Sequence, residues 1–249
     1  MSFILTSFLR FCYRDEDNDL CPTAIGNKNN IRTNIKKHIL KSESIVIISN
    51  DPNDYERNDE VSSVLLDSFK LSGMQFKTVT VLDNRTKKHA KEIVKNADLI
   101  ILLGGEIISQ IKFFNKIKLG KLFKKHSGLV IGISAGAMNL CKDVYNFPEE
   151  ESEFDQPRWV KGIGVFDSPY IPHFDGRRKK YQNSDDEFDV VKDYILPASS
   201  GKEFIGQPND SYILINDGKA QYYGTHYLIK NGKVEKFSLF SDAGAVKIV

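Results

Sequence analysis

The chain has 249 residues, of which 41% are hydrophobic and 27% are charged, and its formal net charge is +2. This composition is ordinary for a globular protein, and the length is sufficient to bury a large core without disulfides. The small net charge gives no reason to expect a nucleic acid or an acidic membrane surface as a partner. The three cysteines match no metal or redox motif, which favours reduced thiols.

The apolar stretch near the start, residues 3–8, is interpreted as a buried strand. It has no basic region before it, it ends before Arg10, and it is too short to span a bilayer. No later segment approaches membrane-spanning length. We therefore expect a cytoplasmic protein without a signal peptide or a membrane anchor.

Strand and helix patterns alternate along the first 135 residues. Predicted strands are continuous apolar runs, and predicted helices repeat apolar residues three or four positions apart. In chain order they are a strand at 3–8, a loop at 14–30, a helix at 29–42, a strand at 44–49, a helix at 58–73, a strand at 76–83, a helix at 86–98, a strand at 99–105, a helix at 106–125 and a strand at 128–132. This alternation indicates an α/β fold with a mainly parallel sheet and helices on both faces.

The pattern changes after about residue 145. Residues 146–158 are acidic and loop-like, a helix is predicted near 184–195, and short strands dominate from residue 203. Asn231-Gly232 is typical of a type I′ hairpin turn. These strands predict an antiparallel meander at one edge of the sheet. We find no internal repeat or linker, so a single domain over 1–249 is expected.

The segment at 132–136, Gly-Ile-Ser-Ala-Gly, places Ser134 between an apolar strand and a helical pattern. A serine with a glycine two residues away on each side is typical of a nucleophile elbow, a sharp turn that projects the hydroxyl from the end of the sheet. The N–H of Ala135 is then placed to donate to an oxyanion. In the alternative interpretation, the glycines only turn the chain.

A nucleophilic serine also needs a base and a second oxyanion donor. Gly104-Gly105 ends a neighbouring predicted strand, where open α/β sheets bind ligands, so the N–H of Gly105 is the expected donor. A tight turn without chemistry is the alternative. Of the five histidines, His173 follows a strand-like run and a proline and is the candidate base. His126, at a predicted helix end, is expected to suit the helix dipole as a cation.

Gly-Ile-Ser-Ala-Gly-Ala at 132–137, Gly104-Gly105 before it and Pro-His-Phe at 172–174 after it, in this order, resemble the peptidase E family of aspartyl dipeptidases, a relative of cyanophycinase. The resemblance covers most of the chain. It implies a flavodoxin-like three-layer sandwich, similar to class I glutamine amidotransferases but with serine in place of their cysteine. It also implies a serine peptidase that needs no metal or organic cofactor and hydrolyses short peptides, in particular dipeptides with N-terminal aspartate.

The family motif assigns a role to each matching residue. Ser134 matches the nucleophile, His173 the general base, and the amides of Gly105 and Ala135 the oxyanion hole. Arg177, with Arg178 adjacent, matches an arginine that holds the carboxylate of the substrate, which suits the planar guanidinium. A solvated run of basic residues is the alternative for these two arginines.

Two positions depart from the family pattern. The family usually has asparagine after the glycine pair, whereas this chain has Glu106, whose charge would oppose an oxyanion unless the side chain points away. Where the family commonly has a glutamate as the third triad member, this chain has Asn209, followed by Asp210. Either Asp210 or Asn209 orients the histidine, or the activity has changed.

The last of these options gives the alternative function, a catalytically weak or inactive binding protein on the same scaffold. The sequence leaves open the oligomeric state and whether the acidic segment 149–155 covers the site.

Overall fold

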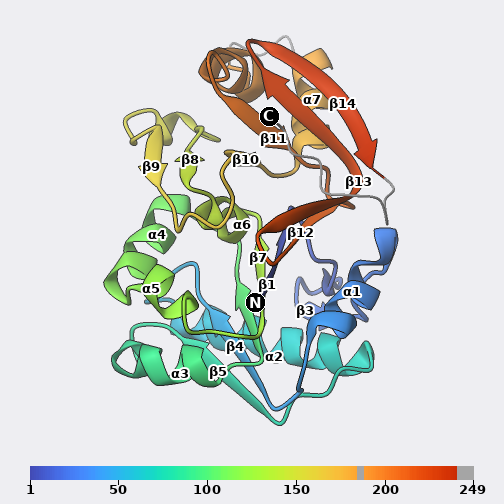
Figure 1. The fold of residues 1–249 in the computed structure, drawn as a ribbon, viewed down its shortest axis with the longest axis vertical. Helices are drawn as coiled ribbons and strands as arrows, with labels where there is room; N and C mark the ends of the chain where they lie inside the picture. The colour runs from blue at the N-terminus through green and yellow to red at the C-terminus, as the bar shows by residue number, and fades with distance from the viewer. Residues whose placement is uncertain (184–187, 240–249) are drawn as a thin grey trace.

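The computed structural model describes residues 1–183 and 188–239. Its main sheet has ten strands (Figure 1): β1 (Ser2–Thr6), β4 (Ser44–Ile48), β5 (Thr78–Leu82), β6 (Leu99–Leu102), β7 (Leu129–Ile133), β10 (Tyr170–Ile171), β11 (Glu203–Gly206), β12 (Tyr212–Asn216), β13 (Lys219–Lys230) and β14 (Lys233–Leu239). The strand order is β10-β11-β13-β12-β1-β7-β6-β4-β5, and β14 pairs with β13.

The half of the sheet made by β1, β7, β6, β4 and β5 is parallel throughout. The carboxyl ends of these strands therefore meet at one edge of the sheet, where open α/β sheets bind ligands. Strand β12 pairs with β1 in the antiparallel sense and begins the other half. The predicted α/β fold with a mainly parallel sheet and an antiparallel edge is confirmed.

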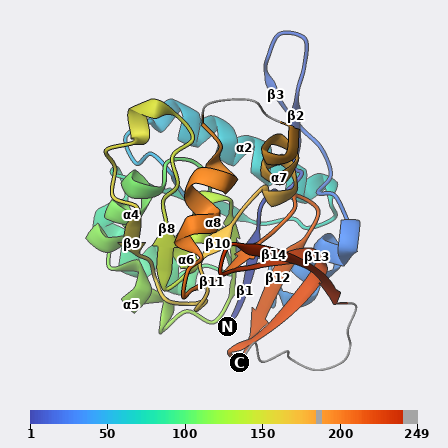
Figure 2. The ribbon, with the colours of Figure 1, turned by 90° about the horizontal axis from the view of Figure 1, so that it is seen from above.

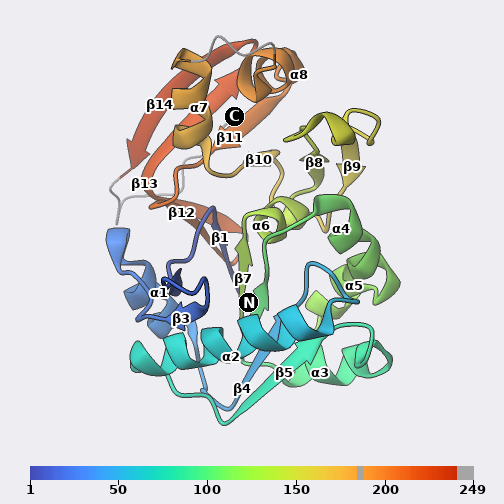
Figure 3. The same cartoon turned by 180° about the vertical axis from the view of Figure 1, so that it is seen from behind.

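Helices cover both faces of the parallel strands. The helices in the described part of the chain are α1 (Ile31–His38), α2 (Tyr55–Leu71), α3 (Ala90–Asn96), α4 (Ile107–Lys116), α5 (Leu119–Phe123), α6 (Ala135–Leu140), α7 (Phe174–Asn183) and α8 (Leu196–Ala198), with three 3₁₀ turns (Lys28–Asn30, Lys87–His89, Glu151–Glu153) and a π-helical turn (Val190–Ile195); α7, α8 and the π-helical turn lie beside the C-terminal strands (Figure 3). Among the residues that the structure describes, no helix combines the length and the apolar character needed to cross a membrane.

The alternation of side chains along the strands separates two cores. Ile47 of β4 packs in the same cluster as Leu65 of α2, whereas the preceding residue, Val46, packs with Phe114 of α4. This alternation follows from the two-residue period of a strand. Figure 3 shows α2 lying across one face of the sheet, while α3, α4 and α5 lie on the other. The expected three layers are therefore present.

The C-terminal strands form the predicted antiparallel meander. Strand β12 pairs with the first part of β13, and the second part of β13 pairs with β14 on one side and with β11 on the other. At the turn between β13 and β14, Asn231 and Gly232 have φ values of 50° and 73°. Two positive φ angles are what a type I′ turn requires, so the hairpin prediction is confirmed.

The segment 14–30, expected to be a loop, contains part of a small hairpin. Strands β2 (Cys12–Arg14) and β3 (Leu20–Pro22) pair in the antiparallel sense, and Figure 2 shows them extending away from the sheet. The carboxylate of Asp15 closes the turn by accepting the N–H of Asp19 at 2.9 Å. Strands of three residues are too short to show an apolar alternation, and for this reason the pattern did not reveal them.

The single helix expected at 106–125 is instead two helices, α4 and α5. Lys118 separates them in a left-handed conformation with φ 56°. The sequence has no proline at this break. Ile117 and Leu119, on either side of Lys118, are both buried, so packing sets the bend. Tertiary packing here overrides a continuous helical period.

The helix expected near 184–195 differs as well. Residues 184–187 lie outside the described part of the chain, and Val190–Ile195 forms a π-helical turn that leads into α8. The segment before it, Phe174–Asn183, is the helix α7. Most residues of α7 are polar or charged, so no apolar stripe marks it in the sequence and periodicity did not identify it.

The acidic segment 146–158 connects two short paired strands, β8 (Asp143–Tyr145) and β9 (Trp159–Lys161). Strand β8 follows α6, and α6 follows β7, which ends at Ile133 just before Ser134. Glu149 and Glu153 of the acidic segment line a cavity together with Ser134, which places this segment at the carboxyl edge of the sheet.

Candidate active site

Ser134 occupies a sharp turn between β7 and α6. Its φ and ψ angles are 51° and −114°, a conformation that non-glycine residues rarely adopt. The turn is held from both sides, because the N–H of Ser134 donates to the carbonyl of Thr6 at 2.9 Å and its own carbonyl accepts the N–H of Ala137 at 2.9 Å. The strained elbow predicted from the sequence is present.

The two glycines of the motif are required by close backbone contacts. A Cβ at Gly132 would lie 2.8 Å from the backbone nitrogen of Ala137, and a Cβ at Gly136 would overlap the carbonyl oxygen of Leu102. Backbone atoms cannot give way as the end of a flexible side chain can. Only glycine fits at these two positions of the elbow.

His173 lies beside the serine, in the turn between β10 and α7. Its Nε2 is 3.1 Å from Oγ of Ser134. The backbone of His173 also has a positive φ, 57°, and its N–H donates to Oγ of Ser7 at 3.1 Å. The hydroxyl of Ser7 in turn donates to the carbonyl of Gln207 at 2.8 Å. Sequence reasoning missed Ser7 and Gln207, because a single buried hydroxyl or amide has no motif.

Asn209 contacts the other side of the imidazole. Its Oδ1 lies 2.5 Å from Nδ1 of His173, so Nδ1 carries the proton that Asn209 accepts and Nε2 faces Ser134. Asp210, the other candidate, forms an ion pair with Lys28 at 2.6 Å. Of the two alternatives that the sequence left open, the structure brings Asn209 to the histidine and directs Asp210 away from it.

The protonation of His173 is set by its surroundings. Burial of the imidazole lowers its pKa below the usual value, and the positive charge of Arg177 acts in the same direction. The hydrogen bond to Asn209 and the negative charge of Glu149 act in the opposite direction without reversing the shift. The imidazole is therefore neutral at pH 7, as a general base must be.

Gly105 lies close to Ser134, just after the end of β6. It has φ 146°, and a Cβ there would overlap the side chain of Asn50. The preceding Gly104 is so close to Ser134 that a Cβ would lie 3.1 Å from Cβ of the serine. The N–H of Ala135 is in the first turn of α6, where amides have no partner within the helix. Gly105 lines the same cavity as Ser134, and Ala135 directly follows the serine, while their role as oxyanion donors stays a prediction.

Glu106 does not direct its charge to this amide pair. It is the N-cap of α4, and its carboxylate accepts the N–H groups of Ile108 at 2.8 Å and Ser109 at 2.5 Å. A carboxylate at this position is stabilised by the helix dipole and by the hydrogen bonds. The departure from the family pattern at Glu106 is therefore explained by helix capping.

The family model of peptidase family S51 matches residues 53–223, more than half of the chain. The chain belongs to peptidase family S51. This membership supports the predicted class, a serine peptidase. No curated protein matches the sequence.

Among solved structures, the S51 chain is similar to that of a "putative peptidase E protein" from Listeria monocytogenes EGD-e. The two share 13% sequence identity with a TM-score of 0.56, and the match covers 89% of this chain and 96% of the other. At this level of identity the likeness concerns the fold, and it agrees with the expected peptidase E-like architecture.

In this S51 chain, Ser134 and His173 open into a cavity of about 400 Å³. Its lining residues are Gly105, Glu106, Ile107, Ser134, Asn146, Phe147, Glu149, Glu153, His173 and Arg177. Glu149 and Glu153 thus place part of the acidic segment 149–155 in the wall of the site. Across residues 1–183 and 188–239, no group of three or more His, Cys, Asp or Glu side chains is arranged to hold a metal ion.

The two candidate arginines lie in different places. Arg177 lines the cavity. Nη2 of its guanidinium lies 2.6 Å from Oε1 of Glu149, and its Cζ lies 4.5 Å from the ring centroid of Phe147. Arg178 instead lies over the ring of Tyr227, outside the lining of the cavity. Arg177 is therefore the arginine that a substrate in the cavity would meet.

His126 differs from its expected role. It is buried beneath α3, with Nδ1 3.0 Å from the carbonyl of Val94, and burial lowers its pKa. The interpretation of His126 as a cation at a helix end is wrong, because the side chain turns inward to the core. His226 is also buried, and burial lowers its pKa to about 4.

Proposed function

We propose that this chain is a serine dipeptidase that hydrolyses peptides with an N-terminal aspartate through Ser134, His173 and Asn209. The observation that carries the proposal is the unbroken hydrogen-bonded order from Oγ of Ser134 to Nε2 of His173 and from Nδ1 to Oδ1 of Asn209. A nucleophile, a base and an orienting group in this order form the arrangement of serine hydrolases.

In the proposed reaction, Oγ of Ser134 attacks the carbonyl carbon of the first peptide bond while Nε2 of His173 takes the hydroxyl proton. The N–H groups of Gly105 and Ala135 stabilise the oxyanion that forms. His173 then returns the proton to the leaving nitrogen, and the acyl-enzyme remains on Ser134. A water molecule, deprotonated by the same imidazole, hydrolyses the ester and restores the serine.

The pair of Arg177 and Glu149 supports a substrate that begins with aspartate. An N-terminal aspartate carries a carboxylate and an α-ammonium close together, and this pair offers a guanidinium and a carboxylate 2.6 Å apart. We propose that the side-chain carboxylate binds Arg177 and the ammonium approaches Glu149. Bidentate binding to a guanidinium stacked on Phe147 would favour aspartate over asparagine.

A second candidate function is a catalytically weak or inactive binding protein on the same scaffold. Asn209 favours it, because an amide stabilises the imidazolium less than a carboxylate does.

Turnover of a peptide substrate separates the two functions. A panel of Asp-Leu, Glu-Leu, Asn-Leu and Ala-Leu with the wild type and Ser134→Ala should show Asp-Leu cleaved best and only by the wild type. Equal cleavage by both proteins would reject the peptidase proposal.

A further inference from the structure

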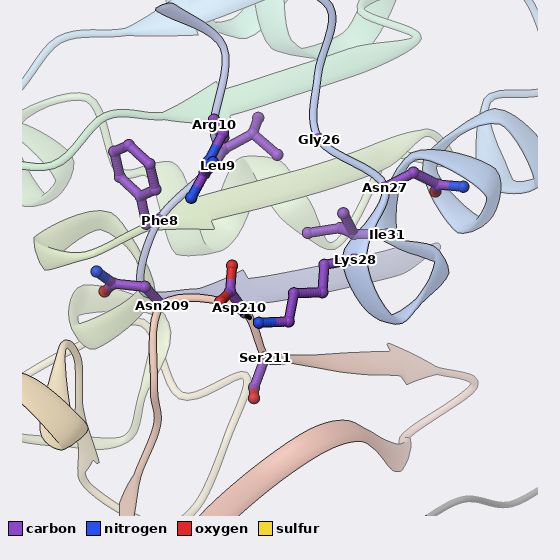
Figure 4. A pocket seen from close by; sticks show the side chains of 10 residues that line it. All are labelled: Phe8, Leu9, Arg10, Gly26, Asn27, Lys28, Ile31, Asn209, Asp210 and Ser211. Atoms are coloured by element: carbon purple, nitrogen blue, oxygen red, sulfur yellow. Dashed lines mark hydrogen bonds and ion pairs between the residues drawn. The ribbon is translucent and has the colours of Figure 1, made fainter. Parts of the chain in front are cut away.

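Asn209 stands on a loop at the surface of the molecule. The residue is exposed, so close packing does not fix the position of its Oδ1 against His173. The loop also faces the start of α1 across a cavity of about 330 Å³, whose lining includes residues 26–28 and 209–211 (Figure 4). Hydrogen bonds to the backbone of the loop therefore set where Asn209 stands.

The inner side of this loop is held by Gln207, which is fully buried. Its Nε2 donates to the carbonyl of Ser211 at 2.8 Å, and the N–H of Ser211 donates to the carbonyl of Pro208 at 3.2 Å. Asn209 and Asp210 are the central residues of the turn that these bonds close. The inner bonds fix the two ends of the turn and leave its centre to be held from outside.

The outer side is held by Asn29, whose Nδ2 donates to the backbone carbonyl of Asp210 at 2.6 Å. The neighbouring Lys28 is directed toward Asp210 and pairs with its carboxylate at 2.6 Å (Figure 4). The two contacts differ in kind. The ion pair joins two exposed side chains and contributes little to stability, whereas the amide of Asn29 holds the backbone that carries Asn209.

Asn29 is itself fixed by its surroundings. Its φ is 52°, in the left-handed region that asparagine tolerates better than most residues. Its carbonyl accepts the hydroxyl of Tyr212, a buried side chain, at 3.0 Å. A Cβ at Gly224 would overlap Nδ2 of Asn29, so the side chain lies directly against the backbone of β13. Asn29 is thus a rigid support for the loop.

We infer that Asn29 is a positioning residue, which holds Oδ1 of Asn209 at Nδ1 of His173 through the backbone of Asp210. The inference rests on the proposed function, in which Asn209 orients the imidazole. A neutral amide needs this support more than a carboxylate would. A hydrogen bond weakens steeply with distance and angle, whereas the attraction between charges decreases slowly.

The test is Asn29→Gly, because glycine adopts a positive φ without strain and the variant loses only the side chain. For Asp-Leu, kcat should fall about fivefold and KM should stay within about twofold of the wild type. Asn30→Gly is the matched control. Asn30 also has a positive φ, 63°, and its side chain makes no hydrogen bond among the residues that the structure describes. Its kcat should stay within about twofold of the wild type.

The Asn209→Ala background separates a positioning role from a general loosening of the fold. This background has no Oδ1 to position, so adding Asn29→Gly should lower kcat by less than about twofold. Equal losses in the two backgrounds, or no loss in the wild type, would overturn the inference.

The rate at which a fluorophosphonate labels Ser134 keeps this test separate from that of the peptidase proposal, since labelling needs His173 but no peptide. Asn29→Gly should react about fivefold more slowly than the wild type, and Asn30→Gly should react at the wild-type rate. A wild type that is labelled but does not cleave Asp-Leu would reject the dipeptidase proposal, and the labelling rates would still decide the role of Asn29. Equal labelling rates for the wild type and Asn29→Gly would reject the inference.

Discussion

Oδ1 of Asn209 lies 2.5 Å from Nδ1 of His173, in the position where a carboxylate stands in most serine hydrolase triads. The amide oxygen accepts the same proton as a carboxylate would, so the imidazole keeps the tautomer that presents Nε2 to Ser134. The amide lacks the negative charge that stabilises the imidazolium formed during the reaction. The geometry of the proposed triad is thus complete while its electrostatics are weaker than with a carboxylate.

Asn209→Asp should therefore raise activity. The new carboxylate would raise the pKa of His173 and stabilise the imidazolium, so kcat for Asp-Leu should increase about tenfold at pH 8. Asn209→Ala should decrease kcat about tenfold or more, because the ring loses its orienting partner. Asp210→Asn is the matched control, and its kcat should stay close to that of the wild type. A kcat of Asn209→Asp as low as that of Asn209→Ala would show that the position does not orient His173.

The pH dependence of kcat/KM should report the lowered pKa of His173. The imidazole is active when neutral, so activity is lost as the pH falls through its pKa, and burial places this acid limb below the usual histidine value. Glu149→Gln removes a charge that raises this pKa. The acid limb should then move to lower pH. A shift to higher pH would contradict the charge assignment around the imidazole.

Arg177 and Arg178 offer a paired test of substrate recognition. Arg177→Ala should lower kcat/KM for Asp-Leu by about 100-fold and leave Ala-Leu nearly unchanged, since only the first substrate has a side-chain carboxylate. Arg178→Ala removes the same charge from a side chain that stacks on Tyr227, and should preserve the preference for aspartate. Equal losses in the two variants would indicate a general effect of charge instead of a specific contact.

Gly136→Ala tests the packing of the elbow, and Gly176→Ala, in α7, is its control. Gly136→Ala places a Cβ against the backbone carbonyl of Leu102, so it should lower the free energy of unfolding by about 1–3 kcal/mol. A Cβ at Gly176, in α7, would meet no atom within 4 Å, so Gly176→Ala should leave the stability unchanged or raise it by up to about 1 kcal/mol. Denaturant unfolding measures both, and similar values for the two variants would contradict the contact at Gly136.

The sequence was sufficient to predict the alternation of strands and helices, the elbow at Ser134 and the hairpin at Asn231-Gly232, because each depends on local residue patterns. It was not sufficient to choose between Asn209 and Asp210. The choice depends on the directions of the two side chains, and Asp210 is paired with Lys28, a residue 182 positions away in the sequence. The positioning of His173 by Ser7 is likewise a long-range contact that no local pattern encodes.

The break at Lys118 and the helix α7 were missed for a related reason. Lys118 takes its left-handed conformation because the residues on both sides are buried, whereas residue type alone predicts a continuous helix. Most residues of α7 are polar or charged, so the helix shows no apolar periodicity in the sequence. The fold places this helix directly after His173, a connection that no local pattern indicates.

The reactivity of Ser134 tests the proposed nucleophile most directly. The wild type should react with a fluorophosphonate to one label per chain, and peptide mapping should locate the label on Ser134. Ser134→Ala should remain unlabelled, and His173→Ala should react much more slowly because the hydroxyl loses its base. A folded wild type whose Ser134 stays unmodified after prolonged exposure would contradict the proposed nucleophile.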